Sequence, residues 1–167
     1  GLSILLVREI SLNKKAASKY LYNSIIIKAL LSIMAFIASY IFLNIANYPA
    51  QTKAVAYIML AFSLLQSFTE VVYSVFRAFE RMHYDAFTKI LRVLMLLIAI
   101  FYLMPKGYGV IAASLAFLAT EAIVLIIAML IAYTKFVKIS FEFDYAFSKN
   151  LLRKSSKIYH QKRTSKR

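Results

Sequence analysis

Residues 110–133 are VIAASLAFLATEAIVLIIAMLIAY, an apolar run in which Glu121 is the only charged residue. A helix needs about 20 mainly apolar residues to cross the hydrocarbon core of a bilayer. The run is long enough, and its apolar residues form a continuous block rather than a helical stripe or a strand alternation. It therefore predicts a membrane-spanning helix.

Three further apolar runs precede it, at residues 24–44, 54–76 and 87–104. The third is apolar only from residue 90, and it is long enough if the charged residues before it extend the helix. Both prolines lie between runs, where a missing N–H removes no helical hydrogen bond. We predict an all-α, polytopic bundle of four transmembrane helices over residues 1–134, followed by a basic cytoplasmic tail at residues 135–167.

The composition agrees with a membrane protein. The chain has 167 residues, of which 62% are hydrophobic, and its mean hydropathy is +0.69. Soluble domains are about 45–50% apolar, and one soluble core of this size could not hide the excess.

The N-terminal residues are also apolar. Residues 1–7 rise only about 10 Å as a helix, which is too short to cross. We interpret them as the truncated end of a helix whose beginning is missing, and we expect the chain to be a fragment.

Basic residues predict the orientation. The chain has 21 Lys and Arg against 7 Asp and Glu, a formal net charge of +14. Residues 1–23, 77–92 and the tail hold eighteen of these cations, and the two intervening connections hold two. Because basic loops stay on the cytoplasmic side, both ends are expected in the cytoplasm of a cell-membrane protein.

The basic tail suggests a binding partner. Lys and Arg near a membrane attract anionic lipid headgroups, so anionic lipid is an expected partner if the tail is genuine. The alternative is that the run HQKRTSKR at residues 160–167 results from a frameshift or an early stop. The tail lacks the interleaved aromatic residues that stack on bases, so no nucleic acid is expected.

Two carboxylates interrupt the predicted spans. Glu70 lies deep in the second span, near Gln66, Thr69 and Tyr73 on one helical face, and Glu121 lies near the middle of the fourth. Neither has a Lys or Arg within four positions, so each is expected to find its partner on another helix. They either line a cavity that responds to protons or cations, or form interhelical hydrogen bonds in a neutral or hydrated state.

Basic residues accompany the same spans. Lys28 and Arg92 lie about one turn inside theirs, where long side chains can snorkel to the headgroups or draw an anionic headgroup inward. Residues 77–89, RAFERMHYDAFTK, predict a helical elbow at the membrane interface, where Glu80 could pair with Arg77 or Tyr84. The candidate substrate or cavity residues are Lys28, Glu70, Arg77, Arg92 and Glu121.

Catalytic and metal-binding patterns are missing from the sequence. It contains no cysteine, its histidines lie far apart at positions 83 and 160, and it has no nucleophile elbow, Walker loop or HExxH motif. The sequence predicts no enzyme, no cofactor and no metal site.

Three segments resemble one transporter family. They are GLSILLVREIS at residues 1–11, VFRAFERMHYDAFTKI at 75–90 and GYGVIAASLA at 107–116. In order and spacing they resemble the O-antigen and oligosaccharide flippases of the multidrug/oligosaccharidyl-lipid/polysaccharide exporter superfamily. Those proteins have 12–14 helices in two lobes around a central cavity, and the resemblance covers nearly all of residues 1–150.

The resemblance implies translocation of lipid-linked oligosaccharide by part of an N-terminal lobe, with the missing transporter helices or other subunits as partners. Two helices and the second lobe of the family are absent from the sequence, so no family substrate residue is transferred. A cation-coupled drug or metabolite exporter of the same superfamily, and a non-transporting four-span scaffold protein, remain as alternatives.

Overall fold

The computed structural model describes residues 2–14, 17–103, 105 and 107–136. These residues form five helices and no strand. The helices are α1 (Leu2–Leu12), α2 (Ala17–Ile45), α3 (Ala50–Ala78), α4 (Met82–Leu103) and α5 (Val110–Lys135). The predicted all-α fold is confirmed.

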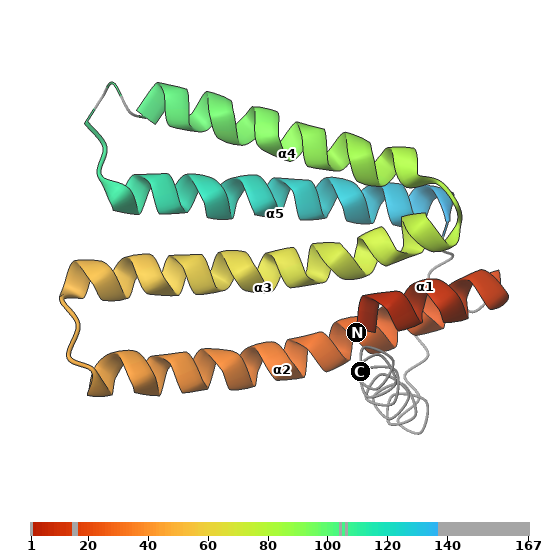
Figure 1. Cartoon of the computed structure of the whole chain (residues 1–167), viewed down its shortest axis with the longest axis horizontal. Helices are drawn as coiled ribbons and strands as arrows, with labels where there is room; N and C mark the ends of the chain where they lie inside the picture. Colours follow the sequence, from red (N-terminus) through yellow and green to blue (C-terminus); the bar gives the residue numbers. More distant parts are fainter. Residues whose placement is uncertain (1, 15–16, 104, 106, 137–167) are drawn as a thin grey trace, which may run out of the picture.

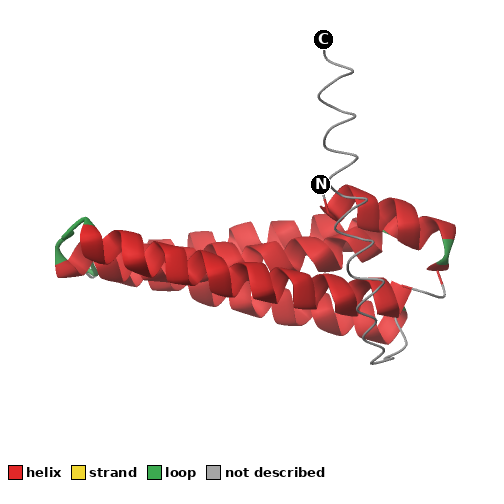
Figure 2. Cartoon of the chain, turned by 90° about the horizontal axis from the view of Figure 1, so that it is seen from below, coloured by secondary structure: helices red, strands yellow, loops and turns green. Residues whose placement is uncertain are grey.

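The four long helices run up and down along one common direction (Figure 1). α5 packs against both α3 and α4, whereas α2 packs against α3 and α1. The short α1 lies at the end where α2 begins and α3 ends, and it packs mainly on α3. Figure 2 shows the same elongated bundle from below.

All four long helices are long and apolar enough to cross a bilayer. The 29 residues of α3 rise about 43 Å and the 22 residues of α4 about 33 Å, against a hydrocarbon core of roughly 30 Å. The four predicted spans are therefore confirmed. The predicted tail lies outside the described residues from position 137 onward.

The helices extend beyond the apolar runs that predicted them. α2 begins at Ala17 rather than at residue 24, and α3 begins at Ala50 rather than at residue 54. The N-terminal apolar run is helical as predicted, although α1 continues past it to Leu12. Hydropathy marks the apolar part of a helix, while hydrogen bonding carries the helix on into polar sequence.

The predicted elbow at residues 77–89 is wrong in its extent. α3 continues to Ala78, only Phe79, Glu80 and Arg81 form the turn, and α4 begins at Met82. Asp85 and Lys89 are thus part of the third long helix. These charged residues are tolerated in the helix because Asp85 forms ion pairs with Arg77 of α3 and with Lys89 of α4.

The buried core lies toward the end of the bundle that contains the α3–α4 turn. All buried residues of α2 fall between Ala17 and Ile27, and those of α3 fall between Thr69 and Ala78. An aromatic cluster closes this end, with Phe76 of α3 contacting Tyr84 of α4 and Phe136 after α5 at centroid distances of 5.8 Å. The core therefore holds α3, α4 and α5 together beside the turn.

The turn itself closes as a Schellman motif. The Arg81 N–H donates to the Phe76 carbonyl at 2.9 Å, and the Glu80 N–H donates to the Arg77 carbonyl at 3.1 Å. Glu80 consequently adopts a left-handed conformation with φ +59°. This position usually holds glycine, because a Cβ makes the left-handed conformation costly.

We predict that Glu80→Gly stabilises the bundle by up to about 1 kcal/mol, since it relieves this strain. Thermal unfolding in detergent micelles, followed by circular dichroism, measures the change. The matched control is Ala86→Gly at an exposed position within α4, which should destabilise by about 1 kcal/mol. A loss of stability in Glu80→Gly equal to that of the control contradicts the prediction.

Candidate functional site

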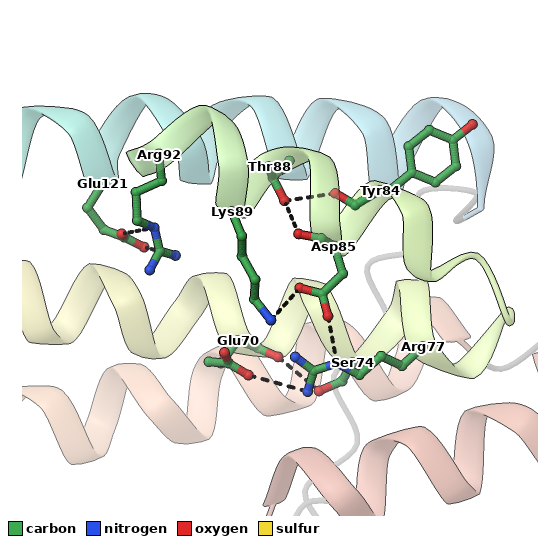
Figure 3. A network of polar contacts seen from close by, with 9 residues as sticks. All are labelled: Glu70, Ser74, Arg77, Tyr84, Asp85, Thr88, Lys89, Arg92 and Glu121. Carbon is green, nitrogen blue, oxygen red and sulfur yellow. Dashed lines mark hydrogen bonds and ion pairs between the residues drawn. The ribbon is translucent and has the colours of Figure 1, made fainter. Parts of the chain in front are cut away.

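Charged side chains gather in two clusters between the apolar helices (Figure 3). The first, here called the mid-bundle triad, consists of Thr69, Arg92 and Glu121. The second, here called the elbow network, consists of Glu70, Arg77, Asp85 and Lys89. The mid-bundle triad joins α3, α4 and α5, and the elbow network joins the consecutive helices α3 and α4.

Glu121 is the centre of the mid-bundle triad. Its side chain is 0% exposed, and the Thr69 hydroxyl of α3 donates to its Oε1 at 2.7 Å. From α4, the Arg92 Nε lies 3.0 Å from Oε2, and Nη2 lies 3.4 Å from Oε1. The shorter contact is an ion pair rather than an aligned hydrogen bond, because the N–H does not point at the oxygen.

Two residues of the triad, Arg92 and Glu121, lie about halfway along their helices, and Thr69 lies in the second half of α3. Arg92 is ten residues from the start of α4, and Glu121 is eleven residues from the start of α5. These separations correspond to about 15 Å and 16 Å of helix rise. A charge at this depth of a membrane protein is costly unless it is paired, so its presence marks a functional site by default.

Glu121 and Glu70 were each predicted to pair with a residue on another helix, and the structure confirms this for Glu121 only. The partner of Glu121 comes from another helix, as predicted. Glu70 instead pairs with Arg77 on the same helix, with 3.6 Å between Oε2 and Nη1, although the Lys28 ammonium of α2 also acts on it electrostatically. The prediction that its partner must come from another helix is wrong, because a long Arg side chain reaches back two turns.

The elbow network joins α3 to α4. The Arg77 Nε donates to Asp85 Oδ2 at 2.9 Å, and the Lys89 Nζ lies 2.8 Å from Oδ1 of the same carboxylate. The side chains of Arg77 and Lys89 remain 30% and 47% exposed. The expected pairing of Glu80 with Arg77 is not formed, because Arg77 is occupied by Glu70 and Asp85.

Asp85 and Lys89 were not among the predicted site residues. Their i, i+4 spacing predicts a helical ion pair, and this signal was available in the sequence. The role of Thr69 as a donor to Glu121 was also missed. A threonine in an apolar run gives no sign of which helix its hydroxyl will face.

Lys28 and Arg92 do not snorkel, which corrects the first of their two interpretations. The Lys28 ammonium donates to the backbone carbonyl of Ser67 on α3. Arg92 lies about three turns inside α4, because that helix begins well before the apolar run. Both cationic groups therefore turn inward to neighbouring helices.

The two clusters and Lys28 together contain four cations and three carboxylates. The predicted site residues are thus brought near to one another on α2–α5, with one positive charge in excess. Among the described residues, no three His, Asp or Glu side chains lie close enough together to hold a metal ion. The cationic side chains can bind an anion, and the carboxylates can bind a proton or another single cation.

Long apolar helices with ion pairs between them define the class of this protein. It is a multi-pass membrane protein of all-helical fold.

A family model with the description "polysaccharide biosynthesis protein" matches residues 1–160. The chain therefore belongs to this family, which is a transporter-type family rather than an enzymatic one. No curated protein and no solved structure matches the chain.

We predict that Arg92→Gln destabilises the bundle by about 3–5 kcal/mol, because it leaves a fully buried carboxylate without a counter-charge. The double variant Arg92→Gln/Glu121→Gln should recover most of this loss. Chemical unfolding in mixed micelles, followed by circular dichroism, measures both.

The matched control is Glu70→Gln, which removes a longer and partly exposed ion pair and should cost about 1 kcal/mol or less. An equal loss in Arg92→Gln and in the double variant contradicts the assignment of Glu121 as an ionised partner.

Proposed function

We propose that this chain takes part in moving lipid-linked oligosaccharide across the cell membrane for polysaccharide export. Its family supports a role in this process. The observation that carries the proposal is the Arg92–Glu121 ion pair, which places an arginine about halfway along helices long enough to span the bilayer.

The chemistry of such a substrate explains why cations are needed. A lipid-linked sugar carries a phosphate or diphosphate group that cannot enter hydrocarbon unless its charge is compensated. Arginine suits this purpose because its planar guanidinium binds phosphate oxygens in pairs. The lipid tail stays in the bilayer while rigid-body movement of helix groups carries the headgroup across.

The exposure of the cations suggests an order of contact. Lys89 and Arg77 are the more exposed and lie beside the α3–α4 turn, while Arg92 is 20% exposed and lies deeper. A headgroup entering from that end would meet the elbow network first and the mid-bundle triad second. Each cation is held by a carboxylate that a phosphate can replace.

A cation-coupled exporter is the second candidate, and the exposure of Glu70 favours it. Its side chain is 41% exposed and lies beside Arg77 and within electrostatic range of Lys28. A carboxylate placed in this way can bind and release a cation. In this case Glu70→Gln would abolish transport. A flippase that binds its substrate through Arg and Lys side chains would tolerate the Glu70→Gln substitution.

The remaining partners keep the status of predictions. Binding of anionic lipids by the basic tail concerns residues outside the described part of the chain. The missing helices or other subunits of a larger transporter are also proposed partners. Membership of a transporter-type family favours transport over the scaffold alternative.

We predict that Arg77→Gln and Lys89→Gln each reduce export about 10- to 100-fold, since each removes one charge-assisted contact worth about 1.5–3 kcal/mol. Surface polysaccharide is measured in cells that depend on this protein for its export. Lys53→Gln is the control, because Lys53 lies near the start of α3, at the opposite end of the bundle. Unchanged export in both variants contradicts the proposed role of these cations.

We also propose that both ends of the chain face the cytoplasm, following the distribution of basic residues. The chain contains no cysteine, so single cysteines at positions 53 and 81 can be labelled without background. A membrane-impermeant maleimide applied to intact cells should label position 53 and leave position 81 unlabelled. Labelling of both positions from outside would overturn this orientation.

A further inference from the structure

Two lysines lie against aromatic rings at the end of the bundle that contains the α3–α4 turn. The Lys14 ammonium, just after α1, lies 5.6 Å from the ring centroid of Phe79, and the Lys135 ammonium, at the end of α5, lies 4.9 Å from that of Tyr84. Both lysines are exposed. An ammonium group is attracted by the face of a ring but keeps its full charge there. This end of the bundle therefore presents two cations to its surroundings.

The rings form a continuous surface between the two lysines. Phe136 contacts Phe79 at a centroid distance of 5.2 Å and Tyr84 at 5.6 Å. α1, the α3–α4 turn and the end of α5 lie at the same end of the bundle (Figure 1). We call the residues Lys14, Phe79, Tyr84, Lys135 and Phe136 the lysine–aromatic surface. It shares no residue with the elbow network or the mid-bundle triad.

The two lysines differ from the cations inside the bundle in having no acidic partner. Arg77, Lys89 and Arg92 each lie 2.8–3.0 Å from a carboxylate oxygen. Within the described part of the chain, neither Lys14 nor Lys135 forms an ion pair. The lysine–aromatic surface thus carries two positive charges that an external anion can neutralise.

Tyr84 adds a hydrogen-bond donor beside one of these charges. The Lys135 Nζ donates to the Tyr84 hydroxyl oxygen at 2.7 Å. Because a phenolic hydroxyl is both donor and acceptor, its own proton remains for another acceptor. Figure 3 shows the Tyr84 ring beside the last turns of α5, with its hydroxyl directed away from the elbow network. An oxygen of a phosphate group can therefore accept from Lys135 and Tyr84 together.

The depth of the surface indicates what kind of anion reaches it. The 29 residues of α3 rise about 43 Å, which equals the thickness of a bilayer including its headgroups, about 40–45 Å. Phe79 follows the last residue of α3 and lies at headgroup level. The apolar run that forms α5 ends at Tyr133, two residues before Lys135. Aromatic rings also concentrate at this level, so a phospholipid headgroup is the anion placed closest to the surface.

We propose that the lysine–aromatic surface binds the phosphate group of an anionic phospholipid, with Lys14 and Lys135 neutralising its charge and Tyr84 donating a hydrogen bond. The inference goes beyond the proposed function, because this phospholipid is a component of the bilayer and is not transported. It also differs from lipid binding by the basic tail. Only Lys135 and Phe136 belong to the predicted tail, and the structure packs both against the rings beside the turn.

Mass spectrometry of the intact full chain, released from micelles that contain phosphatidylglycerol, tests the proposal by giving the dissociation constant of the first bound lipid. We expect Lys14→Gln and Lys135→Gln each to weaken binding about fivefold, and the double variant about 25-fold. Lys135→Arg keeps the charge and should keep the wild-type affinity. Both lysines are exposed, so the helices should stay intact, which circular dichroism verifies.

The matched control is the double variant Lys53→Gln/Lys106→Gln. It makes the same change in net charge near the start of α3 and in the α4–α5 connection, at the opposite end of the bundle. We expect it to bind phosphatidylglycerol as the wild type does. An equal loss of affinity in the two double variants means that binding follows total charge, and it overturns the proposal.

Tyr84→Phe tests the hydrogen bond separately from the ring. The variant keeps the aromatic contacts with Phe76 and Phe136 and loses only the hydroxyl. We expect binding of phosphatidylglycerol to weaken about fivefold. An affinity equal to that of the wild type means that Tyr84 donates no hydrogen bond to the lipid.

The choice of anion identifies its source. Phosphatidylcholine, whose phosphate is already balanced by a choline cation, should bind more weakly than phosphatidylglycerol. Excess inorganic phosphate at constant ionic strength should not displace the bound lipid. Equal binding of the two lipids, or displacement by free phosphate, overturns the assignment to an anionic phospholipid. Because no lipid-linked sugar is present, these results are distinct from a failure of the proposed transport function.

Discussion

A fully buried carboxylate in a bundle of apolar helices needs a cation at hydrogen-bonding distance, and the middle of this protein is arranged around that need. Glu121 accepts a hydrogen bond from the Thr69 hydroxyl of α3 and forms an ion pair with the Arg92 guanidinium of α4. The pairing fixes the rotation of α4 and α5 about their own axes, because any other rotation would leave a charge in hydrocarbon. It also fixes how far the two helices slide along each other. The large apolar contacts between the helices are compatible with many arrangements, and the ion pair selects one.

The elbow network and the aromatic cluster complete this arrangement at one end. Arg77 and Asp85 join α3 to α4 across a turn of three residues, and Phe76, Tyr84 and Phe136 fill the space beside it. α3, α4 and α5 are therefore in contact through polar side chains in the middle of the bundle and through the elbow network and aromatic cluster beside the α3–α4 turn. α2 is tied to α3 by its buried first part and by Lys28. A transporter that works by rigid-body movement needs groups of helices that stay together, and these three helices meet that requirement.

Much of the fold could be predicted from the sequence because lipid imposes a simple rule on backbone and side chains. The apolar runs located all four long helices, and the isolated charges in them identified Glu121 as a residue with a partner on another helix. The helix ends were harder to predict from the sequence. The charged residues Asp85 and Lys89 suggested an elbow at the membrane interface, whereas the structure places them within α4, where they form ion pairs. Snorkelling of Arg92 was a wrong expectation for the same reason, because its depth depends on where α4 begins.

The sequence by itself determined that the chain is a helical membrane protein with four spans, and it marked most of the charges that matter. These properties follow from hydrophobicity and length, which are local and additive along the chain. Only the tertiary structure decided which cation meets which carboxylate, that Arg77 serves two acidic groups, and that Thr69 faces Glu121. Such choices depend on the rotation and sliding of whole helices against one another, and these are set by the sum of many packing contacts that no single stretch of sequence contains.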